Sequence, residues 1–299
     1  MTVGGDTLIP GSFDYMVAHS VDEAVALLDQ HGDEAKILAG GQSLIPLLRF
    51  RLARPSILID INRIDGLEYI QETDGTLHIG AMTREAELDS SDLIRSRYPI
   101  LLDTASGVAD PVVRNWATVG GNLAHADPAN DHPATMLALG ACVVARGPAG
   151  ERAISIDEFF TDMTFETALK SNEVLTEIRI PAPTERSGGA YFKLERKVGD
   201  YAIAGVAVYI TLDANGNVTY AGIGLTNVGP TPIKARDAEH SLLGKPLDDA
   251  SIHQAADLAA AASQPVSDTR GPAEYKRDMV RTLTVRALRK ALARATGGE

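Results

Sequence analysis

The sequence predicts an α+β fold built in three successive parts, and three patterns support that prediction. A strand, a helix and a second strand follow one another between residues 36 and 61. Hairpin-forming segments occupy the middle of the chain, and a run of strands followed by helices fills the part beyond residue 189. Because strand–helix–strand units indicate parallel pairing and hairpins indicate antiparallel pairing, the protein should contain both.

The first part should form a βαβ unit. Residues 21–30 predict a helix that Ser20 can cap, with an apolar stripe at helical spacing. Residues 36–39 are a short apolar run that ends at a Gly-Gly pair, which indicates a strand entering a tight turn. Residues 44–52 then predict a helix, and the β-branched run 56–61 predicts a strand buried on both faces.

The middle part mixes hairpins with helices. Two apolar runs, 67–70 and 77–79, flank Thr73-Asp74-Gly75, which is a hairpin signal. Helices are expected over residues 84–88 and 93–107, and a stretch of strand and turn over residues 118–122. Asp131 and Pro133 mark the start of another helix, and further strands are expected over residues 141–145, 153–156 and 174–180.

A proline- and glycine-rich stretch between residues 181 and 189 is the best candidate for a linker. We therefore expect one domain over residues 1–182, with subdomains of about 1–62 and 63–182, and a second domain over residues 188–299. The second domain should hold strands at 190–195, 202–212 and 218–226, followed by helices at 234–243, 251–262 and 273–295.

Composition excludes several classes of function. The 299-residue chain has a formal net charge of -12, which disfavours binding to nucleic acid and to anionic membranes. No apolar run approaches the ~20 residues of a membrane-spanning helix, and residues 1–11 lack a signal-peptide pattern, so we expect a cytoplasmic protein. The single cysteine, Cys142, has apolar neighbours and should be buried, and one cysteine cannot ligate an iron–sulfur cluster.

The first glycine turn, Ala39-Gly40-Gly41-Gln42-Ser43, follows a strand and precedes a helix. Glycines let backbone N–H groups approach an anion, and the helix start adds partial positive charge, so a pyrophosphate would fit. The turn is neither a Walker A loop nor a GxGxxG fingerprint. Taken alone, such a turn is more often structural than functional.

The second glycine turn, Thr118-Val119-Gly120-Gly121-Asn122, offers another backbone cradle with a hydroxyl and an amide. His125, Asp127 and Asp131 follow it, and they suit a neutral polar site for ribityl hydroxyls better than a metal site, although Asp131 also fits a plain helix cap. Two separate binding turns would suit a long ligand such as FAD.

A third segment covers residues 191–204, and alternate residues of its first part would line one face of a strand. Tyr201 can cover a flavin ring, because aromatic faces stack on conjugated rings. The alternative is core packing for Tyr201 and surface ion pairing for Lys193 and Lys197. No nucleophile has an obvious base, and no GxSxG motif is present.

Taken in order, residues 36–44 (KILAGGQSL), 118–122 (TVGGN) and 196–203 (RKVGDYAI) resemble the FAD-binding medium subunits of molybdenum hydroxylases. The carbon monoxide dehydrogenase medium subunit is the nearer type, and the flavin domain of xanthine dehydrogenase is more distant. The resemblance spans nearly the whole chain. It implies a two-subdomain FAD-binding domain of the vanillyl-alcohol oxidase type, followed by a smaller α+β domain with a three-stranded antiparallel sheet and helices.

The same resemblance implies a set of FAD contacts and no resident metal. The pyrophosphate would lie on residues 39–43, Lys36 and Ile37 would lie beside the adenosine half, and Lys193 and Tyr201 would lie near the flavin ring. Some relatives have histidine where this chain has Gln42; because glutamine cannot form a histidyl–flavin bond, FAD should be non-covalent. The implied contacts are Lys36, Ile37, Ala39, Gly40, Gly41, Gln42, Ser43, Leu44, Val108, Thr118, Gly120, Gly121, Asn122, His125, Asp127, Asp131, Leu175, Lys193 and Tyr201.

The resemblance also implies partner subunits. A large subunit would hold the molybdenum cofactor and oxidise the substrate, and a small subunit would hold two [2Fe-2S] clusters that pass electrons to FAD and then to a quinone or NAD. A dimer of heterotrimers is expected. Carbon monoxide, purines, N-heterocycles and aldehydes all stay open as substrates. The alternatives are a stand-alone flavin reductase or oxidase of the same fold, such as UDP-N-acetylenolpyruvoylglucosamine reductase, and a flavin-free scaffold protein.

Overall fold

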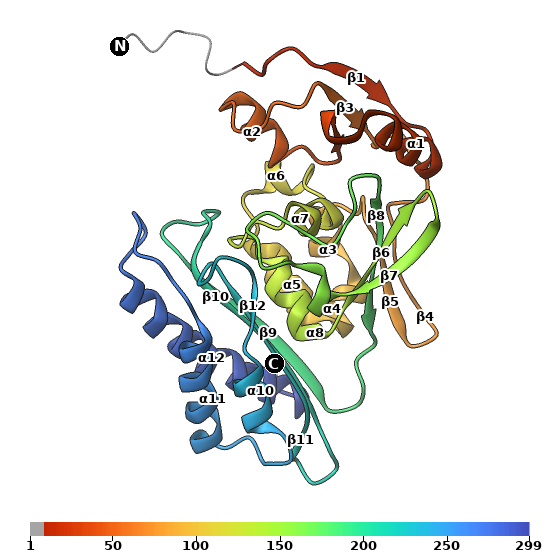
Figure 1. Ribbon diagram of the computed structural model, residues 1–299. Helices are drawn as coiled ribbons and strands as arrows, with labels where there is room; N and C mark the ends of the chain where they lie inside the picture. The colour runs from red at the N-terminus through yellow and green to blue at the C-terminus, as the bar shows by residue number, and fades with distance from the viewer. Residues whose placement is uncertain (1–8, 299) are drawn as a thin grey trace.

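Three β-sheets follow one another along the chain, each with its own hydrophobic core (Figure 1). The computed structural model describes residues 9–298, so residues 1–8 of the N-terminal segment considered for a signal peptide lie outside the described residues. One sheet is parallel and two are antiparallel, which confirms the prediction that both kinds of pairing occur.

The first sheet is parallel and confirms the expected βαβ unit. Helix α2 (Leu44–Arg49) crosses over between two neighbouring strands, and α1 (Val21–His31) begins where the Ser20 hydroxyl accepts the N–H of Glu23 at 3.1 Å. The central strand is buried along its whole length. The sheet order is β1 (Asp14–Val17), β3 (Ile57–Asp60), β2 (Ala35–Leu38).

The second sheet is antiparallel, and its apolar face packs beneath a layer of helices. Leu77, Ile79, Ile178 and Ile180 are fully buried on that face. The strand order is β4 (Ile70–Thr73), β5 (Thr76–Gly80), β8 (Val174–Pro181), β6 (Cys142–Gly147), β7 (Gly150–Ser155). The helices of this part are α3 (Glu85–Ser90), α4 (Asp92–Arg97), α5 (Pro99–Gly107), α6 (Pro111–Arg114), α7 (Val119–His125), α8 (His132–Leu139) and α9 (Ile156–Phe159).

Three expectations for this part were wrong. The single helix expected over 93–107 is broken at Tyr98, because a residue that precedes proline is disfavoured in the helical conformation. The strand and turn expected over 118–122 is instead the capped first turn of α7, with only an isolated bridge from Thr118 to Arg84. Cys142 is half-buried, and its neighbour Val143 belongs to the core of this part instead.

The third sheet is antiparallel with four strands, one more than expected. Its order is β12 (Ile233–Lys234), β11 (Val218–Thr226), β10 (Ala202–Leu212), β9 (Ser187–Glu195). Helices α10 (Arg236–Leu242), α11 (Asp249–Ala262) and α12 (Ala273–Ala295) share one core with this sheet. The other face of the sheet lies on α5 and α8, so these two helices are sandwiched between the second and third sheets (Figure 1).

Candidate functional site

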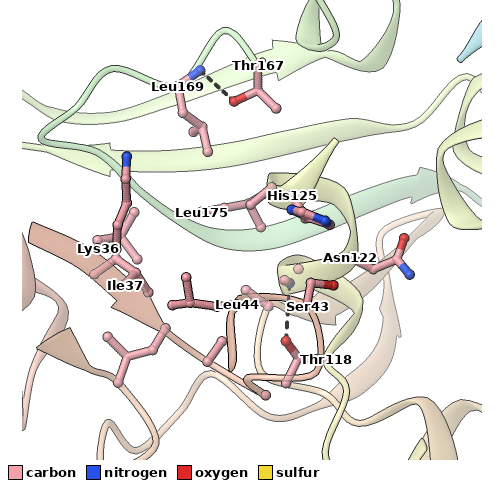
Figure 2. A pocket seen from close by; sticks show the side chains of 18 of the residues that line it. Lys36, Ile37, Ser43, Leu44, Thr118, Asn122, His125, Thr167, Leu169 and Leu175 are labelled. Atoms are coloured by element: carbon pink, nitrogen blue, oxygen red, sulfur yellow. Dashed lines mark hydrogen bonds between the residues drawn. The ribbon is translucent and has the colours of Figure 1, made fainter. Parts of the chain in front are cut away.

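A cavity of about 440 Å³ lies between the first and second parts of the chain. Three separate segments supply most of its lining: β2 with the turn into α2, the residues at α7, and the segment from residue 165 to residue 175. Figure 2 shows Ser43 and Thr118 on one side of this space and Leu169 and Thr167 on the opposite side, with Lys36 extending between them. The cavity is therefore assembled from parts of the sequence that are more than a hundred residues apart.

The first glycine turn exposes its backbone to the cavity. Gly41 has a φ of +74°, a left-handed conformation that glycine adopts without strain. Among the described residues, the N–H groups from Gly40 to Leu44 donate to no backbone carbonyl. Ser43 occupies the N-cap position of α2 but makes no capping bond with its side chain. This turn can therefore present several N–H groups to an anion.

The two glycine turns touch each other. A Cβ atom on Gly40 would overlap the carbonyl oxygen of Trp116, which lies two residues before Thr118, the first residue of the second turn. A Cβ atom on Gly121 would lie 2.6 Å from the Thr118 hydroxyl and 3.8 Å from the Cβ of Ala39. The glycines therefore let two backbone segments approach more closely than any other residue would allow, and both turns face one cavity.

The second turn contributes a polar atom that lacks a partner. Thr118 caps α7 by accepting the N–H of Gly121 at 3.2 Å. The side-chain oxygen of Asn122 is buried and accepts no hydrogen bond from the described residues, and Asn122 is one of the residues that line the cavity. Because a buried acceptor without a donor is costly, this oxygen fits a ligand that brings hydroxyl donors, such as a ribityl chain.

The opposite wall, residues 165–175, supplies apolar surface. Leu169 and Leu175 both line the cavity, and an apolar wall suits an aromatic ring system. Sequence reasoning identified Leu175 only through the resemblance and missed Phe165, Thr167, Leu169 and Lys170. The segment carries no periodic pattern and no glycine turn, so no signal in the sequence pointed to it.

Most of the expected contacts line this cavity, and five do not. The residues in the lining are Lys36, Ile37, Ala39, Gly40, Gly41, Gln42, Ser43, Leu44, Thr118, Gly120, Gly121, Asn122, His125 and Leu175. The residues outside the lining are Val108, Asp127, Asp131, Lys193 and Tyr201.

Asp131 and Lys193 form a buried ion pair beside the cavity. The Lys193 ammonium group donates to the Asp131 carboxylate at 3.1 Å and to the carbonyl oxygen of Gly107, the neighbour of Val108, at 2.7 Å. Tyr191 donates its hydroxyl to the same carboxylate. The Lys193 side chain is 7% exposed, so the alternative of surface ion pairing does not hold for this residue.

Asp131 is also not a plain helix cap. It occupies the N-cap position of α8 but makes no capping hydrogen bond, because its carboxylate is turned to Tyr191 and Lys193. Burial raises the pKa of the Asp131 carboxyl, and the charge of Lys193 opposes that shift. The pair thus ties α8 of the second part to β9 of the third part.

Tyr201 lies near the ion pair of Asp131 and Lys193. Its ring is half exposed, and the Arg270 guanidinium lies 5.8 Å from the ring centroid. Burial raises the pKa of the Tyr201 phenol, and the negative charges of Asp127 and Asp131 raise it further. Val108, Asp127, Asp131, Lys193 and Tyr201 therefore gather around the carboxyl ends of α5 and α7, next to the cavity.

A metal site is not formed here. Within residues 9–298, no group of three His, Cys, Asp or Glu side chains is placed to hold a metal ion, and His125, Asp127 and Asp131 do not come together as such a group. Burial lowers the pKa of His125, which leaves a neutral imidazole on the cavity wall at neutral pH. No helix of the described chain is long and apolar enough to cross a membrane.

Comparison with known proteins identifies the family of the chain. Residues 11–183 match the family described as the FAD binding domain in molybdopterin dehydrogenase, and residues 189–291 match the CO dehydrogenase flavoprotein C-terminal domain. These matches define a flavoprotein subunit of an oxidoreductase. The chain belongs to the FAD-binding medium subunits of molybdenum hydroxylases of the carbon monoxide dehydrogenase and xanthine dehydrogenase type.

The relatives cover the chain almost from end to end. The carbon monoxide dehydrogenase medium chain of Hydrogenophaga pseudoflava is 47% identical, over 96% of this chain and 99% of its own. Subunit alpha of the 6-hydroxypseudooxynicotine dehydrogenase complex of Paenarthrobacter nicotinovorans is 44% identical, over 96% of both chains. A solved structure of the Hydrogenophaga pseudoflava carbon monoxide dehydrogenase matches with a TM-score of 0.93 at 48% identity, covering 96% of this chain and 99% of that one.

Proposed function

We propose that the chain holds one non-covalent FAD in the cavity and uses it to pass electrons from a partner's [2Fe-2S] clusters to a quinone or NAD. The observation that carries the proposal is the pairing of two glycine turns around one cavity: the N–H groups of the first turn donate to no described backbone carbonyl, and the buried side-chain oxygen of Asn122 accepts from no described residue. Bound FAD would supply a group that accepts and releases electrons one or two at a time.

Several segments of the chain would each contact a different part of FAD. The N–H groups from Gly40 to Leu44 would hold the pyrophosphate, Lys36 and Ile37 would contact the adenosine half, and Asn122 would accept from the ribityl chain. Leu175 would pack against the ring system. The group at the carboxyl ends of α5 and α7, namely Val108, Asp127, Asp131, Lys193 and Tyr201, would surround the flavin ring. Gln42 offers no nucleophile for a covalent link.

Partner subunits would supply the iron–sulfur clusters and the molybdenum cofactor. Its only cysteine is half-buried and cannot ligate a cluster by itself, so the [2Fe-2S] clusters would lie on a small subunit and the molybdenum cofactor on a large one. We expect a dimer of such heterotrimers in the cytoplasm.

The substrate would be chosen by the large subunit. The relatives named for carbon monoxide and for 6-hydroxypseudooxynicotine are 47% and 44% identical to this chain, so similarity at this subunit does not separate the two substrates. Carbon monoxide, purines, N-heterocycles and aldehydes remain the candidate classes.

Electron flow can be tested without knowing the substrate. The tagged full-length chain, purified with the subunits that stay bound to it, is reduced anaerobically with a limiting amount of dithionite and then mixed with menadione or NAD. In the wild type, the reduced-cluster EPR signal should decay on mixing. In a complex that carries Gly121→Val, which places side-chain atoms within 2.6 Å of the Thr118 hydroxyl, FAD should be lost and the clusters should stay reduced.

Gly107→Ala is the matched control, because a Cβ atom there would meet nothing within 4 Å. It should keep both FAD and electron transfer. If the clusters of the flavin-free complex were reoxidised as fast as those of the wild type, electron transfer through FAD would be contradicted. Oxidation of an organic substrate by this chain alone would instead favour a stand-alone flavin reductase or oxidase.

A further inference from the structure

Phe165 has a backbone conformation that bulky residues rarely adopt. Its φ is +63°, in the left-handed region where a Cβ atom crowds the following carbonyl. Its ring is also 56% exposed, so burial in the core does not explain the conformation. Strained residues of this kind concentrate at ligand clamps and switch regions.

Bonds on both sides hold the turn that carries Phe165. Phe160 and Thr167 pair as an isolated bridge at the base of the turn, and Thr161 N–H donates to the Glu166 carbonyl at 3.4 Å. At the tip, the Thr164 hydroxyl donates to the carbonyl of Pro230 at 2.8 Å. Pro230 belongs to the third part of the chain, so the turn is fixed between two parts of the molecule.

The fixed turn places the Phe165 ring against His125. The two ring centroids are 5.3 Å apart with the planes tilted by 40°, and both residues line the cavity. Figure 2 shows His125 at the far end of the cavity from Lys36. Met163, in the same turn, is 64% exposed and does not line the cavity.

We propose that Phe165 and His125 form an aromatic clasp that retains FAD in the cavity. This inference rests on the proposed function. The two rings cover one end of the cavity from two segments of the chain, and a bound dinucleotide leaves only when they part. Because burial lowers the pKa of His125, the imidazole is neutral near pH 7 and presents an uncharged face to the Phe165 ring.

The test measures flavin release rather than activity. The tagged complex is loaded with FAD, diluted, and followed by the rise of free-FAD fluorescence. Phe165→Ala and Phe165→Gly should both release FAD roughly tenfold faster than the wild type, in keeping with the loss of an aromatic contact. Phe165→Leu, which keeps an apolar side chain, should be intermediate, and Met163→Ala should match the wild type.

The strained backbone supplies a second, independent readout. Alanine and glycine both remove the ring, but only glycine adopts the left-handed conformation without strain. The flavin-free Phe165→Gly chain should therefore melt about 2 °C or more above Phe165→Ala.

Release from Phe165→Ala at the wild-type rate would overturn the clasp, and so would an equal acceleration in Met163→Ala. Equal melting temperatures for the alanine and glycine variants would overturn the assignment of strain. A wild-type complex that takes up no FAD would instead contradict the proposed function, so the two failures are distinguishable.

Discussion

At the scale of single residues, atoms without partners distinguish the cavity from an ordinary surface cleft. The Asn122 side-chain oxygen is buried and accepts no hydrogen bond from residues 9–298, although buried polar groups are nearly always hydrogen-bonded. Its backbone carbonyl, by contrast, accepts a hydrogen bond from the side-chain amide of Asn130 at 2.8 Å. The backbone of Asn122 therefore stabilises the fold, while its side-chain oxygen is available to accept a hydrogen bond from a ligand.

Replacing Asn122 with alanine should separate these two uses. Loss of one hydrogen bond of about 1–1.5 kcal/mol should weaken FAD binding roughly tenfold. The flavin-free chain should lose no unfolding free energy, because the substitution removes an unsatisfied acceptor and keeps the backbone contact. Fluorescence titration and urea unfolding measure the two effects. Asn215→Ala, in an exposed hairpin turn, is the control, and an Asn122→Ala variant that binds FAD as tightly as this control would contradict the assignment.

The sequence could predict the glycine turns but not this oxygen. Gly40, Gly41, Gly120 and Gly121 leave a visible pattern, because a close backbone approach tolerates no side chain. Whether the Asn122 amide finds a partner depends on what α7 packs against, and Phe165 reaches the cavity through a turn with no sequence pattern. Such features exist only after the segments have come together.

A second residue-scale feature is the buried pair of His132 and Glu85. Their side-chain atoms lie 2.7 Å apart, and both side chains are fully buried. Burial by itself lowers the pKa of His132, but the charge of Glu85 and its hydrogen bond together outweigh burial and raise the net pKa above the ordinary histidine value. The folded chain therefore holds this proton to a higher pH than the unfolded chain does.

This pair should make stability depend on pH. The contribution of the raised His132 pKa is complete below about pH 6.5, the unfolded value, and is lost as pH rises through the folded value. Urea unfolding of the flavin-free chain between pH 6 and pH 9 should show that decline. Glu85→Gln keeps the shape but removes the charge, so its decline should be smaller. The same slope in both proteins would contradict the assignment.

At the scale of elements, periodic segments were predicted well and short edge elements were not. Strands β10 and β11 and helix α12 have the bounds that their sequence patterns predicted. Strand β12 has two residues, and β1 has an exposed first half, so neither carries an alternating apolar pattern. These strands form because a neighbouring strand offers hydrogen bonds, which a single segment of sequence does not reveal.

Strand β11 packs its backbone directly on helix α8. A Cβ atom on Gly222 or Gly224 would overlap the carbonyl oxygens of Ala138 and Ala134. Gly222→Ala should therefore destabilise the chain by about 1–3 kcal/mol, as overpacking does. Gly107→Ala, which meets open space, should be neutral or slightly stabilising. Urea unfolding compares the two, and a Gly222→Ala chain as stable as Gly107→Ala would contradict this packing.

At the scale of the whole molecule, the third part of the chain is bound firmly to the second. Tyr191 and Ala207 from the third sheet belong to the hydrophobic core of the second part. Arg294 of α12 also forms a two-pronged ion pair with Asp103 of α5, at 2.6 and 3.0 Å. Lys193 of β9 is thereby held against Asp131, and Tyr201 follows in the loop between β9 and β10.

The arrangement of the parts was only partly predictable. The two glycine turns indicated a single ligand, and their resemblance to one family gave its identity. The cavity itself forms where residues near 40, 120 and 170 converge, and that convergence depends on how two sheets pack. We therefore expect these converging segments to hold FAD.

The most direct test is to measure the flavin in the tagged full-length chain purified with its bound subunits. Heat or acid release followed by chromatography should yield one FAD per chain, with no FMN and no flavin left attached to the polypeptide. The Gly121→Val chain should contain little or none. A wild-type complex without flavin, flavin that stays bound after denaturation, or a full FAD content in Gly121→Val would contradict the account.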